Sequence, residues 1–303
     1  MKITLDLTEL VERGQLTAVE ADRLKGLAAK DSGTLGSNIF FGFGAVAVAL
    51  GVGVMLPSPQ TAILLGIIFF GLGFSLRIGG QERWALLSQI SMTIGALAVT
   101  GGVWLLSLGA IEVLLALTLA LAGAAVLARS GLLATLSVLT LASALGSGTG
   151  YLFATYGVWV TRPALTIVVL AALTLGLYLV SLRVPAAYER LALIGARTAI
   201  LLMNVAFLVG SLFGDTQWHL DRTVFTVGWA VALIAVAIWA VRANRRWVVN
   251  TAAVFGALHF YTQWFEALGL SPVSVLGGGV LLIAFGLALR WFNRKPAIAT
   301  SAA

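Results

Sequence analysis

Ten stretches of mostly apolar residues follow one another along this chain, separated by short connections. Their approximate bounds are 37–56, 60–78, 85–107, 110–128, 131–148, 163–182, 190–213, 223–241, 246–266 and 272–292. A helix of about 20 apolar residues is long enough to cross the hydrocarbon core of a bilayer. The pattern therefore predicts an all-α polytopic integral membrane helix bundle with about ten transmembrane helices.

Composition supports lipid as the solvent and excludes several classes of function. Hydrophobic residues make up 60% of the chain and charged residues 10%, whereas a soluble domain usually carries about 25% charged residues. The absence of cysteine excludes disulfides, thiolate metal sites and cysteine nucleophiles. Two histidines argue against a multi-histidine metal centre. No HExxH motif or pair of intramembrane aspartates occurs, so we expect no enzyme activity, no metal and no cofactor.

The distribution of Lys and Arg predicts how the chain is threaded. With the N-terminus in the cytoplasm, all but three of the 19 Lys and Arg residues fall on the inner side. Arg162 and Arg222 lie outside, and Arg197 lies within the seventh segment. This is the positive-inside bias of membrane proteins, and it explains the net charge of +7 without a nucleic-acid partner. Both termini are expected in the cytoplasm, with the protein in the inner membrane.

Residues 1–36 are more charged than the rest of the chain, and they predict a cytoplasmic amphipathic helical hairpin. Thr17 and Glu20 have the spacing of a capping box, which marks a helix start. We expect two short helices, at about 7–13 and 18–29. The hairpin is either a simple cytoplasmic cap or a regulatory segment that binds a protein partner.

The remaining domain boundaries follow from the same pattern. The transmembrane domain is predicted over 37–295, and a disordered C-terminal tail over 296–303. The glycine-rich stretch GSGTGYLFATYG makes 131–163 ambiguous, because it can hold one helix or more.

Small residues are expected at the helix contacts, because helices in lipid associate by close packing. Ala116, Ala120, Ala124 and Ala128 recur at four-residue spacing. The run Gly277–Gly279 lies early in the last segment, where another backbone or a ligand can approach closely.

The ninth segment is predicted to span the membrane, although it contains several polar residues. His259, Gln263 and Glu266 are spaced i, i+4 and i+7 and share one helical face, whereas Asn250 falls on the opposite face. Two interpretations remain open. The histidine is a hydrogen-bonded structural residue, or it takes part in a proton-linked step, since its charge can switch near neutral pH.

The seventh segment carries Arg197 and, seven residues later on the same face, Asn204. Ionisable groups inside a bilayer are candidates for function because they are costly to place there. Arg197 either extends to the inner headgroups or pairs with an anionic ligand or a buried carbonyl.

Two further polar groups have alternative interpretations. A stripe on the third segment includes Gln89, Thr93, Thr100 and Ser107, and it either makes interhelical hydrogen bonds or lines a water-filled path. The outer loops contain an acidic set that forms either a solvated surface or a cation-attracting mouth. Its members are Glu112, Asp215, Asp221 and Glu266.

Both ends of the chain are similar to a family of predicted bacterial membrane proteins, DUF2157. The resemblance lies in GQLTAVEADRL near the start, and in WVVNTAAVFGALHFYTQWFEALG and GGGVLLIAFGLALRWFNRK near the end. The matching positions are Asn250, Trp264, Phe265, Glu266, Gly278, Gly286, Arg290 and Arg294. Gln263 departs from the family, which often has arginine there. The resemblance implies a bacterial inner-membrane protein with an N-terminal cytoplasmic hairpin, and it brings no established activity.

Two hypotheses about function follow. The first is a secondary carrier for a small solute or proton, with a midplane cavity lined by the third, seventh and ninth segments. The ten-helix architecture is similar to that of drug/metabolite transporters, although no repeat aligns between 37–150 and 163–292. The second is a non-catalytic membrane scaffold or sensor whose head binds a partner. The predicted substrate-binding residues are Gln89, Arg197, Asn204, Asn250, His259, Gln263 and Glu266.

Overall fold

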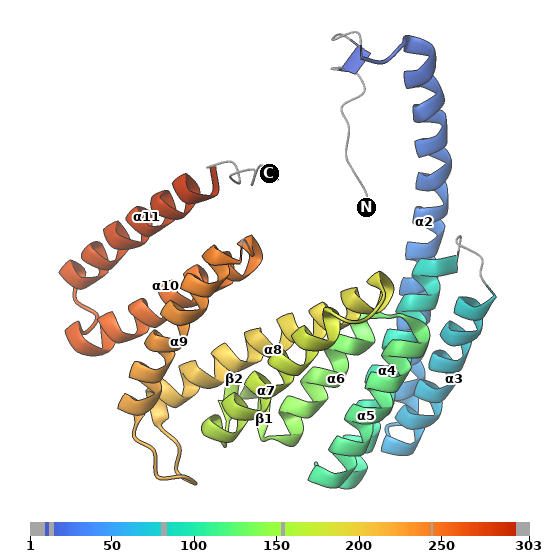
Figure 1. Ribbon diagram of the computed structural model, residues 1–303. Coiled ribbons are helices and arrows are strands. Elements are labelled where there is room, and N and C mark those ends of the chain that lie inside the picture. The colour runs from blue at the N-terminus through green and yellow to red at the C-terminus, as the bar shows by residue number, and fades with distance from the viewer. Residues whose placement is uncertain (1–9, 12–14, 80–83, 153–154, 244, 295–303) are drawn as a thin grey trace. The chain divides into compact units, whose positions relative to one another are not determined.

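The computed structural model describes residues 10–11, 15–79, 84–152, 155–243 and 245–294 (Figure 1). The chain divides into two compact units, which are described here one at a time. The first unit comprises residues 1–140 and the second comprises residues 141–303.

The described part of the first unit is helical. Its helices are α2 (Ala18–Met55), α3 (Pro59–Ile78), α4 (Ala85–Ser107), α5 (Ile111–Ala128) and α6 (Gly131–Ala144), the last of which runs across the boundary. The second unit begins with a β-hairpin and continues with helices. Its elements are β1 (Ser147–Leu152), β2 (Thr155–Val160), α7 (Pro163–Ser181), α8 (Ala186–Phe213), α9 (Arg222–Arg242), α10 (Arg246–Leu268) and α11 (Pro272–Arg294).

Each predicted apolar segment overlaps one of these helices, although the predicted segment 131–148 runs beyond the end of α6 into β1. In the part of the chain that the structure describes, six helices are long and apolar enough to cross a membrane: α3, α4, α5, α7, α8 and α9. The apolar stretches of α2, α6 and α11 are shorter. The fold is therefore all-α apart from one hairpin, and its apolar helices are compatible with a multi-pass membrane protein.

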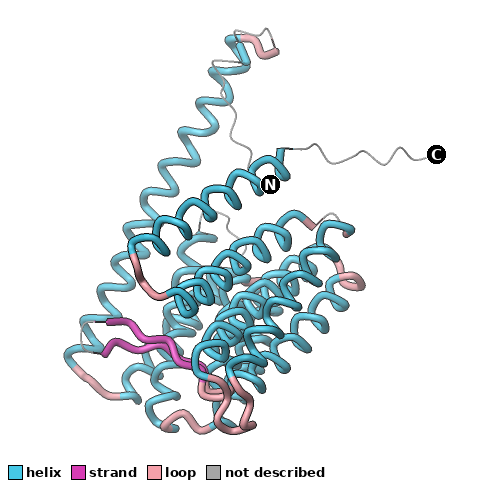
Figure 2. The backbone as a smooth tube through the Cα atoms, turned by 90° about the vertical axis from the view of Figure 1, so that its left-hand side faces the viewer, coloured by secondary structure: helices cyan, strands magenta, loops and turns pink. Residues whose placement is uncertain are grey.

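The ambiguous stretch forms a hairpin rather than a continued helix (Figure 2, magenta). Helix α6 ends at Ala144, and Gly146 takes a left-handed backbone with φ +91°. The strands then pair antiparallel, from Ser147 opposite Val160 to Leu152 opposite Thr155. A Cβ on Gly148 would lie 2.7 Å from the ring of Trp159, so glycine leaves room for that indole.

The capping box at the start of α2 is confirmed. The Glu20 backbone N–H donates to Thr17 Oγ1 at 3.3 Å, and the Thr17 N–H donates to Glu20 Oε2 at 3.0 Å. The predicted helix end near residue 29 is wrong, because α2 continues to Met55. The first proline of the chain is Pro57, so no proline interrupts the helix before that point.

Two predictions about the ends fall mainly outside the described residues. Of the predicted helix at 7–13, only residues 10–11 are described, and they are helical. The predicted tail at 296–303 lies wholly outside the described residues.

Glycines bring α3 and α4 into backbone contact. A Cβ on Gly66 would lie 2.7 Å from Gly95 O, and one on Gly73 would lie 2.7 Å from Ser88 O. The Ser88 hydroxyl donates a hydrogen bond to Gly73 O at 2.7 Å. Helix α2 also packs on α4, where a Cβ on Gly42 would meet the side chain of Ile90.

An apolar cluster completes the first unit. It is formed by Met92 and Ala96 of α4, Leu121, Ala125 and Ala128 of α5, and Leu133 and Ala134 of α6.

In the second unit, α10 and α11 pack through the predicted glycine run. Trp264 Nε1 donates to Ser274 O at 3.0 Å, and a Cβ on Gly278 would lie 3.4 Å from the Tyr261 hydroxyl. At Gly277 and Gly278 the neighbours are side chains of α10 at ordinary contact distance, and nothing lies within 4 Å of a Cβ at Gly279, so no close backbone approach is seen at this run.

Candidate functional site: a cavity among four helices

A cavity of about 560 Å³ lies among α7, α8, α9 and α10 of the second unit. This volume is within the range of small-molecule sites, about 300–1,000 Å³. Five aromatic side chains contribute to its wall: Tyr178, Phe207, Trp229, Trp239 and Trp247. Three arginines contribute as well: Arg197, Arg245 and Arg246. Most of the remaining lining is aliphatic.

The four helices are joined around the cavity by specific contacts. Tyr178 of α7 meets Trp239 of α9 edge-on, with ring centroids 5.8 Å apart. Helix α8 approaches α9 closely at Gly210, where a Cβ would lie 2.6 Å from the ring of Phe225. Helix α8 has 28 residues, or about 42 Å, and is longer than the roughly 30 Å hydrocarbon core requires.

Trp229 lines the end of the cavity that is farther from the three arginines. Its side chain is 1% exposed, and its Nε1 donates a hydrogen bond to Asn204 Oδ1 at 2.8 Å. Asn204 in turn donates from Nδ2 to Ile200 O at 2.8 Å. Phe207 lies parallel to the indole, with centroids 6.3 Å apart, and His259 meets it edge-on at 4.9 Å. Both ends of the Asn204 amide are therefore engaged, and the indole is held from three sides.

His259, which contacts this indole, and Gln263, one turn further along α10, are not among the lining residues of the cavity. His259 Nδ1 and Gln263 Nε2 are buried, and neither has a hydrogen-bond partner among the described residues. Buried polar atoms normally have a hydrogen-bond partner, so two such atoms without one on adjacent turns of the same helix call for an explanation.

The opposite end of the cavity carries positive charge. Arg197 lies over the indole of Trp247, with its Cζ 4.9 Å from the ring centroid, which is cation–π geometry. Arg245 and Arg246 are exposed where α10 begins. A smaller neighbouring cavity of about 310 Å³ shares Arg197 and is also lined by Glu189 and Arg190. The cavity thus extends from the α9–α10 turn to Trp229, with arginines at one end and aromatic rings at the other.

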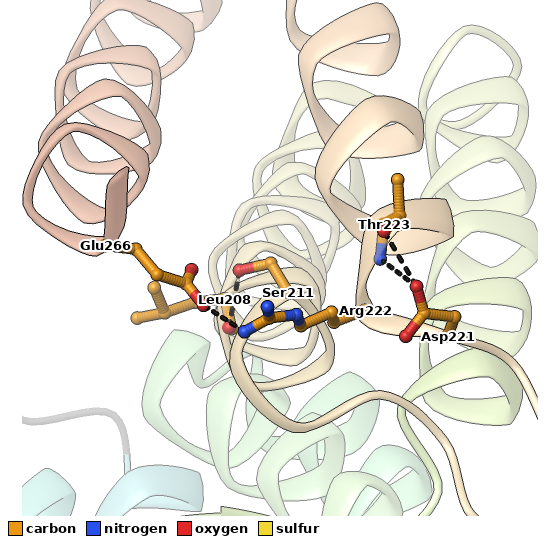
Figure 3. Close-up of polar contacts among 6 residues, drawn as sticks. All are labelled: Leu208, Ser211, Asp221, Arg222, Thr223 and Glu266. Carbon is orange, nitrogen blue, oxygen red and sulfur yellow. Dashed lines mark hydrogen bonds and ion pairs between the residues drawn. The ribbon is translucent and has the colours of Figure 1, made fainter. Parts of the chain in front are cut away.

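Two of the predicted acidic residues, Asp221 at the end of the α8–α9 loop and Glu266 of α10, have structural partners (Figure 3). Glu266 forms an ion pair with Arg222. Asp221 caps α9, accepting from the Thr223 hydroxyl at 2.7 Å. This hydrogen bond, followed by the one from the Thr223 N–H, lowers the pKa of Asp221.

Asp215 is buried, and it joins two segments. Its Oδ2 accepts from the Ala164 N–H at the start of α7 at 3.0 Å. Its Oδ1 accepts from the backbone N–H groups of Gln217 and Trp218 at 2.9 and 3.0 Å. These carboxylates are therefore occupied by caps and an ion pair, which favours the structural interpretation over a cation-attracting mouth.

The structure brings together three of the seven predicted substrate-binding residues. Arg197 and Asn204 line the cavity, and His259 contacts Trp229 in its wall. Gln263 lies one turn further along α10. Glu266 lies near the other end of α10, in the ion pair with Arg222.

The other two predicted residues lie elsewhere. Asn250 is exposed and does not line the cavity, although its neighbours Thr251 and Ala252 do. Gln89 lies half-buried in the first unit and is not among the described lining residues of the cavity, so its predicted role stays a prediction. Hydroxyls of its stripe bond carbonyls of their own helix, as Thr93 does to Gln89 O at 2.7 Å.

Sequence reasoning missed the aromatic lining and the two arginines at the start of α10. Arg245 and Arg246 agree with the positive-inside bias, which by itself does not indicate that they line a cavity. A signal was present in Arg245–Arg246–Trp247, which puts an aromatic ring directly after two cations.

No protein-family model, no curated protein and no solved structure matches this sequence.

Proposed function

We propose that this chain is a multi-pass protein of the bacterial inner membrane, and that helices α7–α10 form the solute site of a secondary carrier. Both termini lie in the cytoplasm in this proposal, and the likeness to the DUF2157 family belongs to it. The observation that carries the proposal is the cavity itself, which has the size of a ligand site and polar groups at both ends.

The lining supports a binding role over a purely structural one. Small-molecule sites are lined mainly by aromatic and aliphatic side chains, with a few polar groups at defined places. This cavity has aromatic side chains in its wall, among them Tyr178 and Trp239, which contact each other, and it has arginines at one end and Asn204 at the other.

The polar residues behind Trp229 support a path that continues beyond the cavity. His259, Gln263 and Glu266 follow one another along α10 from the indole towards Arg222. In this proposal Trp229 separates the cavity from that path in the observed state. A change of its side-chain position would connect the two, as alternating access requires.

The alternative is a scaffold or sensor whose head binds a partner. It is favoured by the capped start of α2, which is exposed and charged. A solute-dependent effect on the second unit would not be expected for this function.

The proposed orientation is tested with single cysteines, because the chain has none of its own. Thr216→Cys lies in the α8–α9 loop and Ala243→Cys lies in the α9–α10 turn, and both positions are exposed. An impermeant thiol reagent should label Thr216→Cys in intact cells and Ala243→Cys only after lysis. The reverse result would contradict the orientation.

Solute binding is tested by thermal stability of the purified protein against a panel of ions, pH values and metabolites. A ligand at about 100 times its dissociation constant adds roughly 2.7 kcal/mol to the stability of the folded state. Ala232→Phe should abolish the shift, because Ala232 lines the cavity. Ala235→Phe is the matched control, since Ala235 is exposed on the same helix and does not line it. A shift that survives Ala232→Phe would place the ligand elsewhere.

A further inference from the structure

The chemistry of the cavity wall points to one class of ligand. We infer that the α7–α10 cavity binds an anionic amphiphile, with its anionic head at Arg197, Arg245 and Arg246 and its apolar body along the aromatic wall. This inference rests on the proposed solute-binding function and names the substrate class.

Charge is the first argument. The described lining residues include three arginines and no carboxylate. Arginine stays protonated at any physiological pH and binds carboxylate and phosphate oxygens through its planar guanidinium. The neighbouring cavity, which shares Arg197, is lined by one carboxylate, that of Glu189, and by a further arginine, Arg190. The arginine end of the cavity therefore keeps an excess of positive charge.

The start of α10 is the second argument, and it comes from the backbone. Residues 245–248 all line the cavity, so the first turn of α10 borders it. Within the described part of the chain, no side chain caps this helix start. The amide groups and the dipole at such a terminus favour an anion.

The remainder of the cavity argues for an apolar body. From Arg197 to Asn204 the wall extends seven residues along α8, or about 10 Å. Over this length it presents Tyr178, Phe207 and Trp239 together with aliphatic side chains. A small hydrated anion would leave this surface uncovered, whereas an acyl chain or a flat ring system would cover it.

The ordered contact of Arg197 with Trp247 is consistent with a prearranged head site. A guanidinium held over an indole has lost part of its freedom before any ligand arrives. Less rotamer entropy is then lost on binding.

Tryptophan quenching provides the test, since Trp229, Trp239 and Trp247 line the cavity. The full chain is placed in nanodiscs of zwitterionic phosphatidylcholine. It is titrated with a bromododecyl sulfonate, which stays anionic, and with the matching bromododecanol. We expect saturable quenching by the sulfonate, with half-saturation about tenfold or more below that of the alcohol. Partition into the bilayer alone gives quenching that does not saturate.

Variants locate the head and the body. Arg197→Gln should weaken sulfonate binding about tenfold, or about 1.4 kcal/mol, and leave the alcohol unchanged. Arg183→Gln, at an exposed position of the α7–α8 turn outside the cavity lining, should have no effect. Ala232→Phe should abolish saturable quenching. Each variant is checked by its melting temperature.

The other outcomes separate this inference from the proposed function. Equal binding of alcohol and sulfonate, both lost in Ala232→Phe, would overturn the ligand class and leave the solute cavity standing. Displacement of the probe by inorganic sulfate at similar concentrations would show that the ligand is a free anion without an apolar body. Saturable quenching that persists in Ala232→Phe, or no saturable quenching at all, would overturn the inference at this cavity.

Discussion

The α3–α4 pair and the α7–α10 group solve the problem of helix association in opposite ways. In the first, Gly66, Gly73 and Gly95 let two backbones touch. In the second, aromatic side chains such as Trp229 and Trp239 make contacts between helices and border a cavity. Close backbone packing suits a part that only has to stay together. Large side chains with specific partners suit a part that has to keep space for something else.

The largest expected effect comes from breaking the close pair. Gly95→Leu should separate α3 from α4, because its Cβ would lie 2.6 Å from the Gly66 carbonyl oxygen, and backbone cannot move aside as a side chain can. We expect a loss at the upper end of overpacking penalties, about 3 kcal/mol or more. Thermal melting of the purified protein in detergent measures it.

Gly101→Leu is the control on the same helix, because nothing lies within 4 Å of a Cβ at Gly101. Its melting temperature should stay close to that of the parent. Equal losses in the two variants would contradict the close approach at Gly95.

The bounds of most helices could be predicted from the sequence, because hydropathy and the Lys/Arg bias are local signals. The predicted segment 85–107 is the observed α4, for example. The pairing of α3 with α4 was not predicted. Glycines of this pair, such as Gly66 and Gly73, recur at seven-residue spacing in the sequence. The spacing within one helix does not indicate which other helix packs against it.

The four alanines at four-residue spacing, Ala116 to Ala128, likewise do not indicate which face of their helix is buried. The buried face of α5 includes Leu114, Leu121 and Ala128, whereas Ala116 and Ala120 lie on its exposed side. Small residues permit close packing, but the neighbouring helices decide which face is used.

The candidate site could be predicted only in part for a related reason. Arg197 and Asn204 stood out because polar groups in apolar helices are costly. Trp229 did not stand out, because an indole in an apolar segment is ordinary. Its importance arises from Asn204 and His259, which come from two other helices.

A second prediction concerns the wall of the cavity. Asn204→Leu should cost about 1–3 kcal/mol, because it leaves the buried Trp229 N–H without its acceptor. Thermal melting again measures the loss. The double variant Asn204→Leu/Trp229→Phe removes both partners and should recover part of it. Additive losses would show that the two side chains act independently.

A third prediction concerns the link between the α8–α9 loop and α7. Asp215→Ala should cost about 1–2 kcal/mol, because the Ala164 N–H loses its cap and two loop amides lose their acceptor. Hydrogen exchange should quicken at the start of α7. Asp221→Ala is the matched loop control, and it should affect the start of α9 instead.

The smallest expected effect is a pH dependence at the start of α2 that α3 and α4 of the same unit do not share. The Thr17 backbone N–H, and then its hydroxyl, hold the pKa of Glu20 below its ordinary 4.5. A depressed folded pKa means that the contribution is complete above 4.5 and is lost as pH falls through the folded value. The protection of amides at the start of α2, taken as their exchange rate relative to an unstructured peptide at the same pH, should therefore fall on acidification below about that pH in the parent protein, and Glu20→Gln should remove this dependence. Glycine contacts such as Gly66 with Gly95 involve no titrating group, so exchange in α3 and α4 should not follow the same curve. If amides of α4 lost protection together with those of α2, the start of α2 would be coupled to the α3–α4 pair through the α2–α4 contact. The three helices would then form one cooperative element.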